Sequence, residues 1–210
     1  MSETRGVGSR TLLLATGNRG KLAELAELLA PLVLELRSLA SLPGFEPPPE
    51  GDDYGRNASA KALVAAQTNG CAALGDDSGI EVAALGGAPG PLSARYGGAG
   101  LDDAGRSRRL LEALARSGSA DRSALFVCVA AFATPAGEVT LARGECRGSI
   151  LAAARGGAGF GYDPVFQPEG YELSMAELPC ELKNRISHRG RAIQALAPVL
   201  TRAFGAAPSA

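Results

Sequence analysis

The 210-residue chain has no tryptophan and only one histidine, and its six phenylalanines and four tyrosines make up just 5% of the sequence. With so few rings available, each Phe or Tyr that falls in a polar loop is a candidate for a binding role. Phe160 and Tyr162 lie in such a loop, which is rich in glycine. Their segment is therefore a candidate part of a binding site.

A surplus of basic residues is also absent. The chain has 21 Lys and Arg residues against 22 Asp and Glu residues, which gives a formal net charge of −1. A protein that grips the backbone of a nucleic acid usually carries a surplus of positive charge. We therefore expect a small anionic ligand, and no nucleic acid polymer as a partner.

Long apolar runs and paired cysteines are missing as well. No stretch approaches the roughly 20 apolar residues of a membrane-spanning helix, and residues 1–10 lack the apolar run of a signal peptide. The four cysteines form no Cys-x-x-Cys pair, which argues against a zinc site. We expect a cytoplasmic protein with reduced thiols and no membrane partner. Cys128 and Cys146 flank a predicted turn at similar distances and could face each other across a hairpin, where we interpret both as buried thiols.

The distribution of apolar residues predicts strands that alternate with helices, followed by a hairpin. Strands are expected at 11–15, 33–36, 71–74, 124–133 and 139–146, with residues 75–79 at a strand end. Helices are expected at 21–30, 57–67, 102–115 and 190–204. This order of elements indicates an α/β protein with a mixed sheet.

The segment TGNRGK at 16–21 connects the first predicted strand to the first predicted helix. The first backbone amides of a helix have no partner within the helix, and together with the helix dipole they attract anions. Lys21 adds a full positive charge at this position. The spacing differs from the Walker pattern. An ordinary strand–helix connection with a solvated lysine explains the segment equally well.

Adjacent carboxylates occur in Asp76-Asp77-Ser78-Gly79. Two neighbouring carboxylates repel each other unless a cation neutralises them, and hard oxygen ligands suit Mg²⁺. Successive side chains of a strand point in opposite directions, so one of the two is expected to reach the metal. Glu50, in an acidic loop, is our candidate for a second ligand. The alternatives are an Asp-rich turn with a helix cap and solvent-exposed loop acids.

Two later segments combine aromatic or basic residues with glycine. In Phe160-Gly161-Tyr162-Asp163-Pro164, a ring can stack on a nucleobase and the carboxylate can accept from a ring N–H. The alternative is a turn whose rings anchor it to the core. Residues 183–191 (KNRISHRGR) hold the only histidine beside a cluster of basic residues, which suits a phosphate or the keto oxygens of a base. The alternative is a solvated charged face.

Five segments in this order, spread over residues 12–200, resemble the inosine/xanthosine triphosphate pyrophosphatases, also called non-canonical purine nucleoside-triphosphate pyrophosphatases. The segments are TGNRGK at 16–21, GDDSGIEV at 75–82, LGGAPGPLSARYGG at 85–98, GFGYDPVF at 159–166 and KNRISHRGRA at 183–192. Each segment is weak evidence alone, but five in order at consistent spacing are specific. The chain departs from the family at Arg56, where the family commonly has Glu.

The resemblance implies an α/β fold of two lobes around a long mixed, curved β-sheet flanked by helices. It implies a single two-lobed catalytic domain over 11–204, between flexible segments at 1–10 and 205–210. It also implies a homodimer and one or more Mg²⁺ ions per subunit. Asp77 would be the general base and a metal ligand, with Glu50 as the second ligand that we choose. The implied substrate-binding residues are Thr16, Gly17, Asn18, Arg19, Gly20, Lys21, Ser78, Phe160, Gly161, Tyr162, Asp163, Lys183, His188 and Arg189.

The predicted reaction is hydrolysis of ITP, dITP and XTP to the monophosphate and pyrophosphate, which removes deaminated purines from the nucleotide pool. Asp77 would orient or deprotonate the water that attacks the α-phosphorus, and Lys21 would neutralise the leaving pyrophosphate. Donors from Lys183 and Arg189 would favour the 6-keto oxygen over the 6-amino group of adenine. The alternatives are a pyrophosphatase for other modified or pyrimidine nucleotides, a non-catalytic nucleotide sensor and an RNA-binding module.

Overall fold

The computed structural model describes residues 10–39 and 45–205. Of the predicted flexible segments, only Arg10 and Gly205 belong to these ranges; residues 1–9 and 206–210 lie outside the described residues. None of the helices in the described ranges has the length and apolar character required to cross a bilayer.

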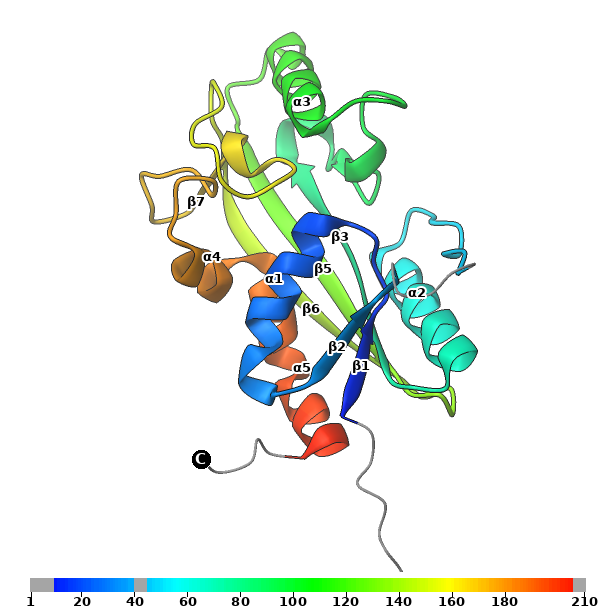
Figure 1. Ribbon diagram of the computed structural model, residues 1–210. Coiled ribbons are helices and arrows are strands. Elements are labelled where there is room, and N and C mark those ends of the chain that lie inside the picture. Colours follow the sequence, from blue (N-terminus) through cyan, green and yellow to red (C-terminus); the bar gives the residue numbers. More distant parts are fainter. Residues whose placement is uncertain (1–9, 40–44, 206–210) are drawn as a thin grey trace, which may run out of the picture.

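A single mixed sheet organises the described chain, with strand order β2-β1-β3-β5-β6-β7 and β4 paired to β3 (Figure 1). The strands are β1 (Thr11–Leu14), β2 (Glu35–Ser38), β3 (Ala73–Val82), β4 (Pro89–Gly90), β5 (Ser123–Ala133), β6 (Val139–Ile150) and β7 (Phe166–Pro168). β1 pairs in parallel with β2 and β3. The pairs β3–β5, β5–β6 and β6–β7 are antiparallel. The predicted mixed sheet is confirmed.

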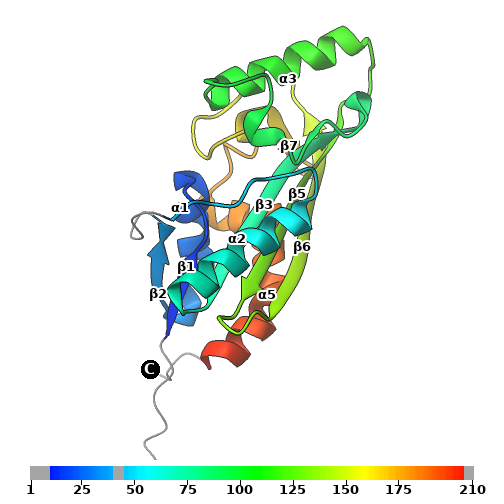
Figure 2. The same ribbon diagram turned by 90° about the vertical axis from the view of Figure 1, so that its right-hand side faces the viewer.

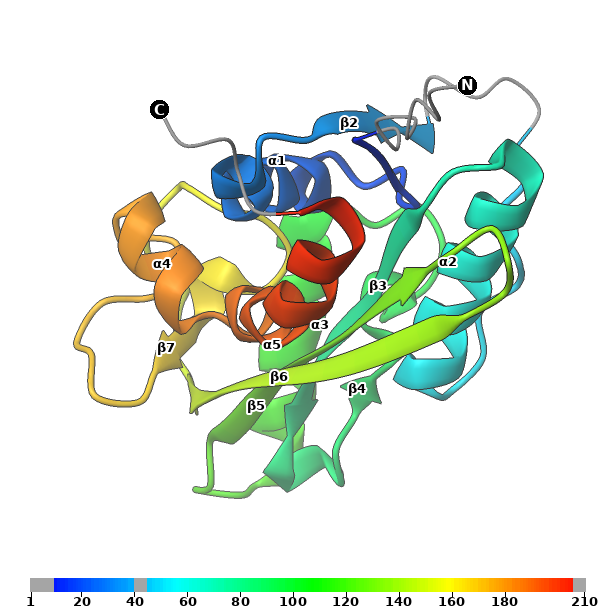
Figure 3. The same cartoon turned by 90° about the horizontal axis from the view of Figure 1, so that it is seen from below.

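Helices cover both faces of the sheet. They are α1 (Arg19–Leu29), α2 (Tyr54–Asn69), α3 (Asp103–Ser117), α4 (Cys180–Ile186) and α5 (His188–Phe204). Seen from below, β3 and β5 run between α5 on one side and α2 on the other (Figure 3). The side view places α3 at the far end of the long strands, away from β1, β2 and α2 (Figure 2). The long strands therefore connect two lobes.

Alternation along the strands divides the core into three clusters. Leu12 and Leu14 pack with α1 and α5 on one face, whereas Leu13 packs with the alanines of α2 on the other. The third cluster joins the far ends of β3 and β5 to Leu110 and Leu114 of α3. The small alanine side chains of α2 let the helix backbone approach the sheet closely. The approach is so close that a Cβ at Gly75 of β3 would lie 2.8 Å from the carbonyl oxygen of Ala58.

The prediction that the strand ends at residues 75–79 is wrong, and so is the alternative of an Asp-rich turn. β3 continues through them, with Asp76 opposite Ala130 and Asp77 opposite Val129 of β5. Gly and Asp have low intrinsic strand propensity, but propensity yields to tertiary context. Here the complete antiparallel ladder with β5 holds the strand, and buried cations on each face neutralise the two carboxylates.

The suggested pairing of Cys128 with Cys146 across the β5–β6 hairpin is also wrong. Cys128 is opposite Gly144, and Cys146 is opposite Phe126. The two thiols belong to different core clusters, and both are free and buried, as expected from the sequence. The short elements α4 and β7 were not predicted, because seven and three residues are too few to show a periodic pattern.

Gly144 of β6 lies directly beneath the first turn of α5. A Cβ at this position would overlap the carbonyl oxygen of His188 and the amide nitrogen of Ala192. Because both are backbone atoms of a packed helix, we expect Gly144→Ala to lower the free energy of unfolding by about 1–3 kcal/mol. Urea denaturation measures this change. Gly157→Ala is the control, since its Cβ would meet nothing within 4 Å, and equal stability of the two variants would contradict the close seating of α5.

Candidate active site

Strand alternation sends the side chains of β3 to opposite faces of the sheet. Asp76 and Ser78 face α1 and α5, where Arg189 donates to both of them. Asp77 faces α2, where Asn57 and Lys61 donate to its carboxylate. The adjacent aspartates therefore lie on opposite faces of β3, as strand alternation predicts.

The turn before α1 brings a lysine to the middle of β3. The Asn18 side chain caps the helix by accepting from the backbone amide of Lys21 at 3.1 Å. The Lys21 ammonium then reaches β3, with its nitrogen 3.0 Å from Oδ2 of Asp76. Burial opposes ionisation of Asp76, but Lys21 and Arg189 hold the pKa of this carboxyl below its usual value. The carboxylate is therefore charged and pairs with both cations.

A buried ionic network continues from Asp76 toward α4. Arg189, only 1% exposed, also donates to Glu24 of α1. Glu24 in turn contacts the ammonium of Lys183 at 2.6 Å, and Lys183 contacts Oδ2 of Asp163 at 2.5 Å. Although burial lowers the pKa of Lys183, Asp163 and Glu24 raise it above its ordinary value. The network thus fixes the two cations that the sequence assigns to base binding.

Phe160 lies between this network and the first turn of α1. The centre of its ring is 5.4 Å from Nζ of Lys183 and 5.5 Å from Cζ of Arg189. A Cβ added to Gly20 would overlap the ring, so only glycine allows the ring to lie against α1. The Phe160 ring therefore touches both the predicted phosphate turn and the predicted base-binding cations.

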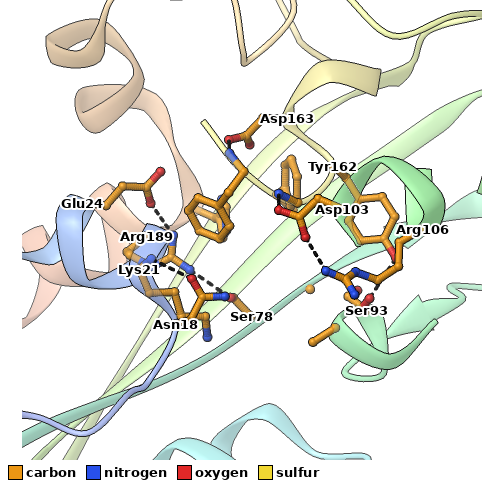
Figure 4. Close-up of a pocket in the computed structure, with 16 residues that line it drawn as sticks. Asn18, Lys21, Glu24, Ser78, Ser93, Asp103, Arg106, Tyr162, Asp163 and Arg189 are labelled. Atoms are coloured by element: carbon orange, nitrogen blue, oxygen red, sulfur yellow. Dashed lines mark hydrogen bonds and ion pairs between the residues drawn. The ribbon is translucent and has the colours of Figure 1, made fainter. Parts of the chain in front are cut away.

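A cavity lies beside the Phe160 ring, and Asn18, Lys21 and Ser78 are among its lining residues (Figure 4). Other walls come from α3, β5 and the start of α5. His188 stacks on Phe126 with ring centres 4.6 Å apart and planes 7° from parallel. Burial, together with the nearby Arg189 and Lys183, lowers the pKa of His188 well below its usual value, so the ring is neutral. Tyr162 closes the opposite side, where its hydroxyl donates to the carbonyl of Ser93 at 2.8 Å.

On the other face of β3, two carboxylates converge on one lysine. Nζ of Lys61 is 2.8 Å from Oε1 of Glu50 and 3.3 Å from Oδ1 of Asp77. Asn57 donates to Oδ2 of Asp77 at 2.8 Å and accepts from the amide of Gly51 at 2.8 Å, which ties the acidic loop to α2. Burial raises the pKa of Asp77, and Lys61 opposes this change. Two carboxylates gathered around a positive charge are a donor set that also suits a hard divalent cation.

The structure brings many of the predicted site residues together. Those that line the cavity are Asn18, Lys21, Ser78, Phe160, Gly161, Tyr162, Asp163, His188 and Arg189. Lys183 and Gly20 lie against Phe160, and Asp77 and Glu50 share Lys61. Thr16 accepts from the amide of Asn18 and so shapes the turn, whereas Gly17 and Arg19 are not among the lining residues.

The residues of the site that were not singled out from the sequence include Glu24, Asn57, Lys61, Asp103, Arg106 and Phe126. A signal existed for three of them. Asn57 and Lys61 are four residues apart on α2 and so share one face, and Glu24 lies one turn after Lys21 on α1. Asp103 and Arg106 carried no such signal, because only the fold brings α3 to the cavity.

The combination of features defines a class of site. A capped helix start with a lysine attracts anions, and an aromatic ring flanked by cations beside a cavity accepts a planar heterocycle. In an α/β protein, both features around one cavity indicate a nucleotide-binding protein.

Comparison with known proteins gives the family. The Ham1 family model matches residues 12–199. The chain is 46% identical over 194 residues to the dITP/XTP pyrophosphatase of Desulforamulus reducens, covering 92% of this chain and 96% of that relative. It is 47% identical over 187 residues to the dITP/XTP pyrophosphatase of Deinococcus radiodurans, covering 89% and 91%. The structure of a HAM1 protein from Coxiella burnetii matches with a TM-score of 0.81 at 41% identity, covering 91% of this chain and 98% of that one. The chain belongs to the Ham1 family.

These matches confirm the family resemblance and the fold class expected from the five segments. The relatives named dITP/XTP pyrophosphatase cover nearly the whole chain, and the solved Ham1 structure shares its architecture.

Proposed function

We propose that this protein hydrolyses non-canonical purine nucleoside triphosphates, namely ITP, dITP and XTP, to the monophosphate and pyrophosphate. The observation that carries the proposal is the position of Lys21. Its ammonium contacts both the carboxylate and the backbone carbonyl of Asp76, the residue next to Asp77 on β3. A triphosphate held by Lys21 can therefore reach the paired carboxylates while its base enters the cavity. The names of the relatives support the same reaction.

The residues that would hold a Mg²⁺ ion are Asp77 and Glu50. Both carboxylates contact the same ammonium, that of Lys61, so they lie close enough together to share a cation. A magnesium ion usually takes one or two protein carboxylates and completes its shell with water and substrate phosphates. When bound, it would withdraw charge from the phosphoryl group under attack.

Two hydrogen bonds support the catalytic role that we propose for Asp77. Its Oδ2 atom accepts from Asn57 and its Oδ1 atom from Lys61, so the carboxylate is held at a fixed angle. Burial raises its pKa, which makes it a stronger base than an exposed aspartate. In our proposal Asp77 orients or deprotonates the water that attacks the α-phosphorus. Lys21 and the amides at the start of α1 then neutralise the leaving pyrophosphate.

Base selection follows from hydrogen-bond donors in and beside the cavity. Lys183 and Arg189 can only donate, so they suit the 6-keto oxygen of hypoxanthine and xanthine. Adenine carries a donor at that position and would leave buried donors unpaired. Four donor contacts of Arg189 already serve Asp76, Glu24 and Ser78, so it has little donor capacity left for a base. In our proposal Lys183 and the neutral His188 share the base contacts with it.

The test is pyrophosphate release from ITP, dITP, XTP, GTP and ATP, each measured with and without Mg²⁺. We expect release from the first three with Mg²⁺, little from ATP, and almost none after chelation. Tight binding of ITP without release would identify a sensor, and faster release from pyrimidine triphosphates would overturn the assigned substrate class.

The proposal also covers the oligomeric state and the cellular location of the protein. We expect a homodimer in a cytoplasmic setting, with no nucleic acid polymer and no membrane among its partners. Sedimentation equilibrium of the purified protein tests the first of these, and a monomer at micromolar concentration would contradict it.

A further inference from the structure

Helix α3 contacts the segment that carries Phe160. Two side chains of α3 bind the backbone of Gly161, the next residue along the chain. The Gly161 amide donates to Oδ2 of Asp103 at 2.7 Å, and its carbonyl accepts from the Ser107 hydroxyl at 3.2 Å. Asp103 and Ser107 are four residues apart and so share one face of the helix. Both polar groups of a single peptide residue are thus held by side chains of α3 (Figure 4 shows the Asp103 contact).

Gly161 is the residue of this segment most in need of such support. Its φ of +64° lies in the left-handed region that glycine alone enters without strain. Glycine has no side chain of its own to hold that conformation. Its neighbours are anchored elsewhere: Asp163 to Lys183, and Tyr162 to the carbonyl of Ser93. Asp163 also holds Phe160 itself, because its Oδ2 atom accepts from the Phe160 amide at 2.9 Å. The two bonds from α3 therefore give the Phe160 ring a second anchor, on the opposite side of its peptide segment from Lys183.

We infer that Asp103 and Ser107 are positioning residues for nucleobase binding, which act by holding Gly161 and thereby the Phe160 ring. This inference rests on the proposed function. Asp103 is itself held by an ion pair with Arg106 of the same helix. The lobe that contains α3 therefore contributes to base affinity. The phosphate turn before α1 and the paired carboxylates Asp77 and Glu50 belong to the other lobe, with α1 and α2.

The experiment compares two probes that are not turned over. IMP carries the base and one phosphate, whereas inorganic tripolyphosphate carries phosphates alone. We expect Asp103→Ala to weaken IMP binding about ten- to a hundredfold, the usual scale for a lost hydrogen bond to a charged group. Tripolyphosphate binding should stay unchanged. In turnover, KM for ITP should rise while kcat stays nearly constant, because the chemistry occurs at the other end of the substrate.

Three further variants separate positioning from other roles. Ser107 does not line the cavity that Asp103 lines, so Ser107→Ala tests positioning without a direct contact to the ligand, and we expect IMP to bind about two- to tenfold more weakly. Asp103→Asn keeps an acceptor for the Gly161 amide and should restore most of the affinity. Glu112→Ala removes an exposed residue of the same helix, paired with Arg109, and should change neither probe.

The outcomes decide the inference directly. Equal weakening of IMP and tripolyphosphate binding would show that α3 supports the whole site. Unchanged IMP binding in both Ser107→Ala and Asp103→Ala would show that these two side chains do not position the Phe160 ring. If Asp103→Ala does not fold, the double variant Asp103→Asn/Ser107→Ala carries the test. A wild-type protein that binds IMP but releases no pyrophosphate from any purine triphosphate would contradict the proposed reaction. The effect of Asp103 and Ser107 on IMP binding could still be measured in that case.

Discussion

Replacing Asp77 with asparagine should lower turnover of ITP by about three orders of magnitude, within the range found when a general base is lost. The amide keeps the shape of the side chain and its contact with Asn57, which donates to Oδ2 at 2.8 Å. It loses the charge that pairs with Lys61 and the basicity needed to activate water. Because the fold is preserved, the loss should appear in kcat while thermal unfolding changes little.

The matched control for Asp77→Asn is Asp52→Asn in the acidic loop, where the side chain is exposed. It should keep wild-type turnover, whereas Glu50→Gln should lose activity and require more Mg²⁺ for half-maximal rate. Near-normal turnover of a folded Asp77→Asn protein would remove Asp77 from the mechanism. If Asp52→Asn, and not Glu50→Gln, changes the Mg²⁺ requirement, the second ligand is misassigned.

Replacing Arg189 with glutamine should have two effects, one on stability and one on selectivity. Asp76 and Glu24 each lose one of two buried cationic partners, and Lys21 and Lys183 remain. We therefore expect the free energy of unfolding to fall by less than about 3–5 kcal/mol, the cost of a fully uncompensated buried charge. The kcat/KM for ITP should also fall by about two to three orders of magnitude, the scale for a lost charged donor in the transition state. ATP hydrolysis should fall less, because glutamine offers an acceptor to the 6-amino group.

Arg191→Gln is the control for Arg189→Gln. Arg191 is two residues further along α5 and exposed, and its guanidinium donates to the backbone carbonyl of Glu145. Its replacement should change stability by less than about 0.5 kcal/mol. The quantity to measure is the ratio of kcat/KM for ITP to that for ATP, since general damage to the site cancels in it. An unchanged ratio in Arg189→Gln would make Arg189 a structural counter-ion of Asp76 and Glu24.

Helical periodicity and short motifs allowed most of the architecture to be predicted. The apolar spacing of α1 and α3 and the long apolar run of β5 are local signals, so they can be recognised without the rest of the chain. Strand β3 could not be placed in this way. Its Gly-Asp-Asp-Ser-Gly sequence resembles a turn, and only pairing with β5 and the buried cations around it make it a strand.

The site shows the same division between local and distant information. The sequence by itself determined that a lysine follows a strand–helix turn, that an aromatic pair lies among glycines and that basic residues surround the only histidine. These patterns are short, so one stretch of chain is enough to carry them. They also indicated a small anionic ligand, because no basic surplus is present.

The tertiary structure alone decided which face of β3 each aspartate occupies. Alternation requires Asp76 and Asp77 to point apart, but the helices that pack on each face determine which one meets Arg189 and which meets Lys61. The same holds for Glu24, which bridges cations more than 150 residues away in sequence. Contacts between distant segments depend on how helices and strands pack, and no local pattern encodes that packing.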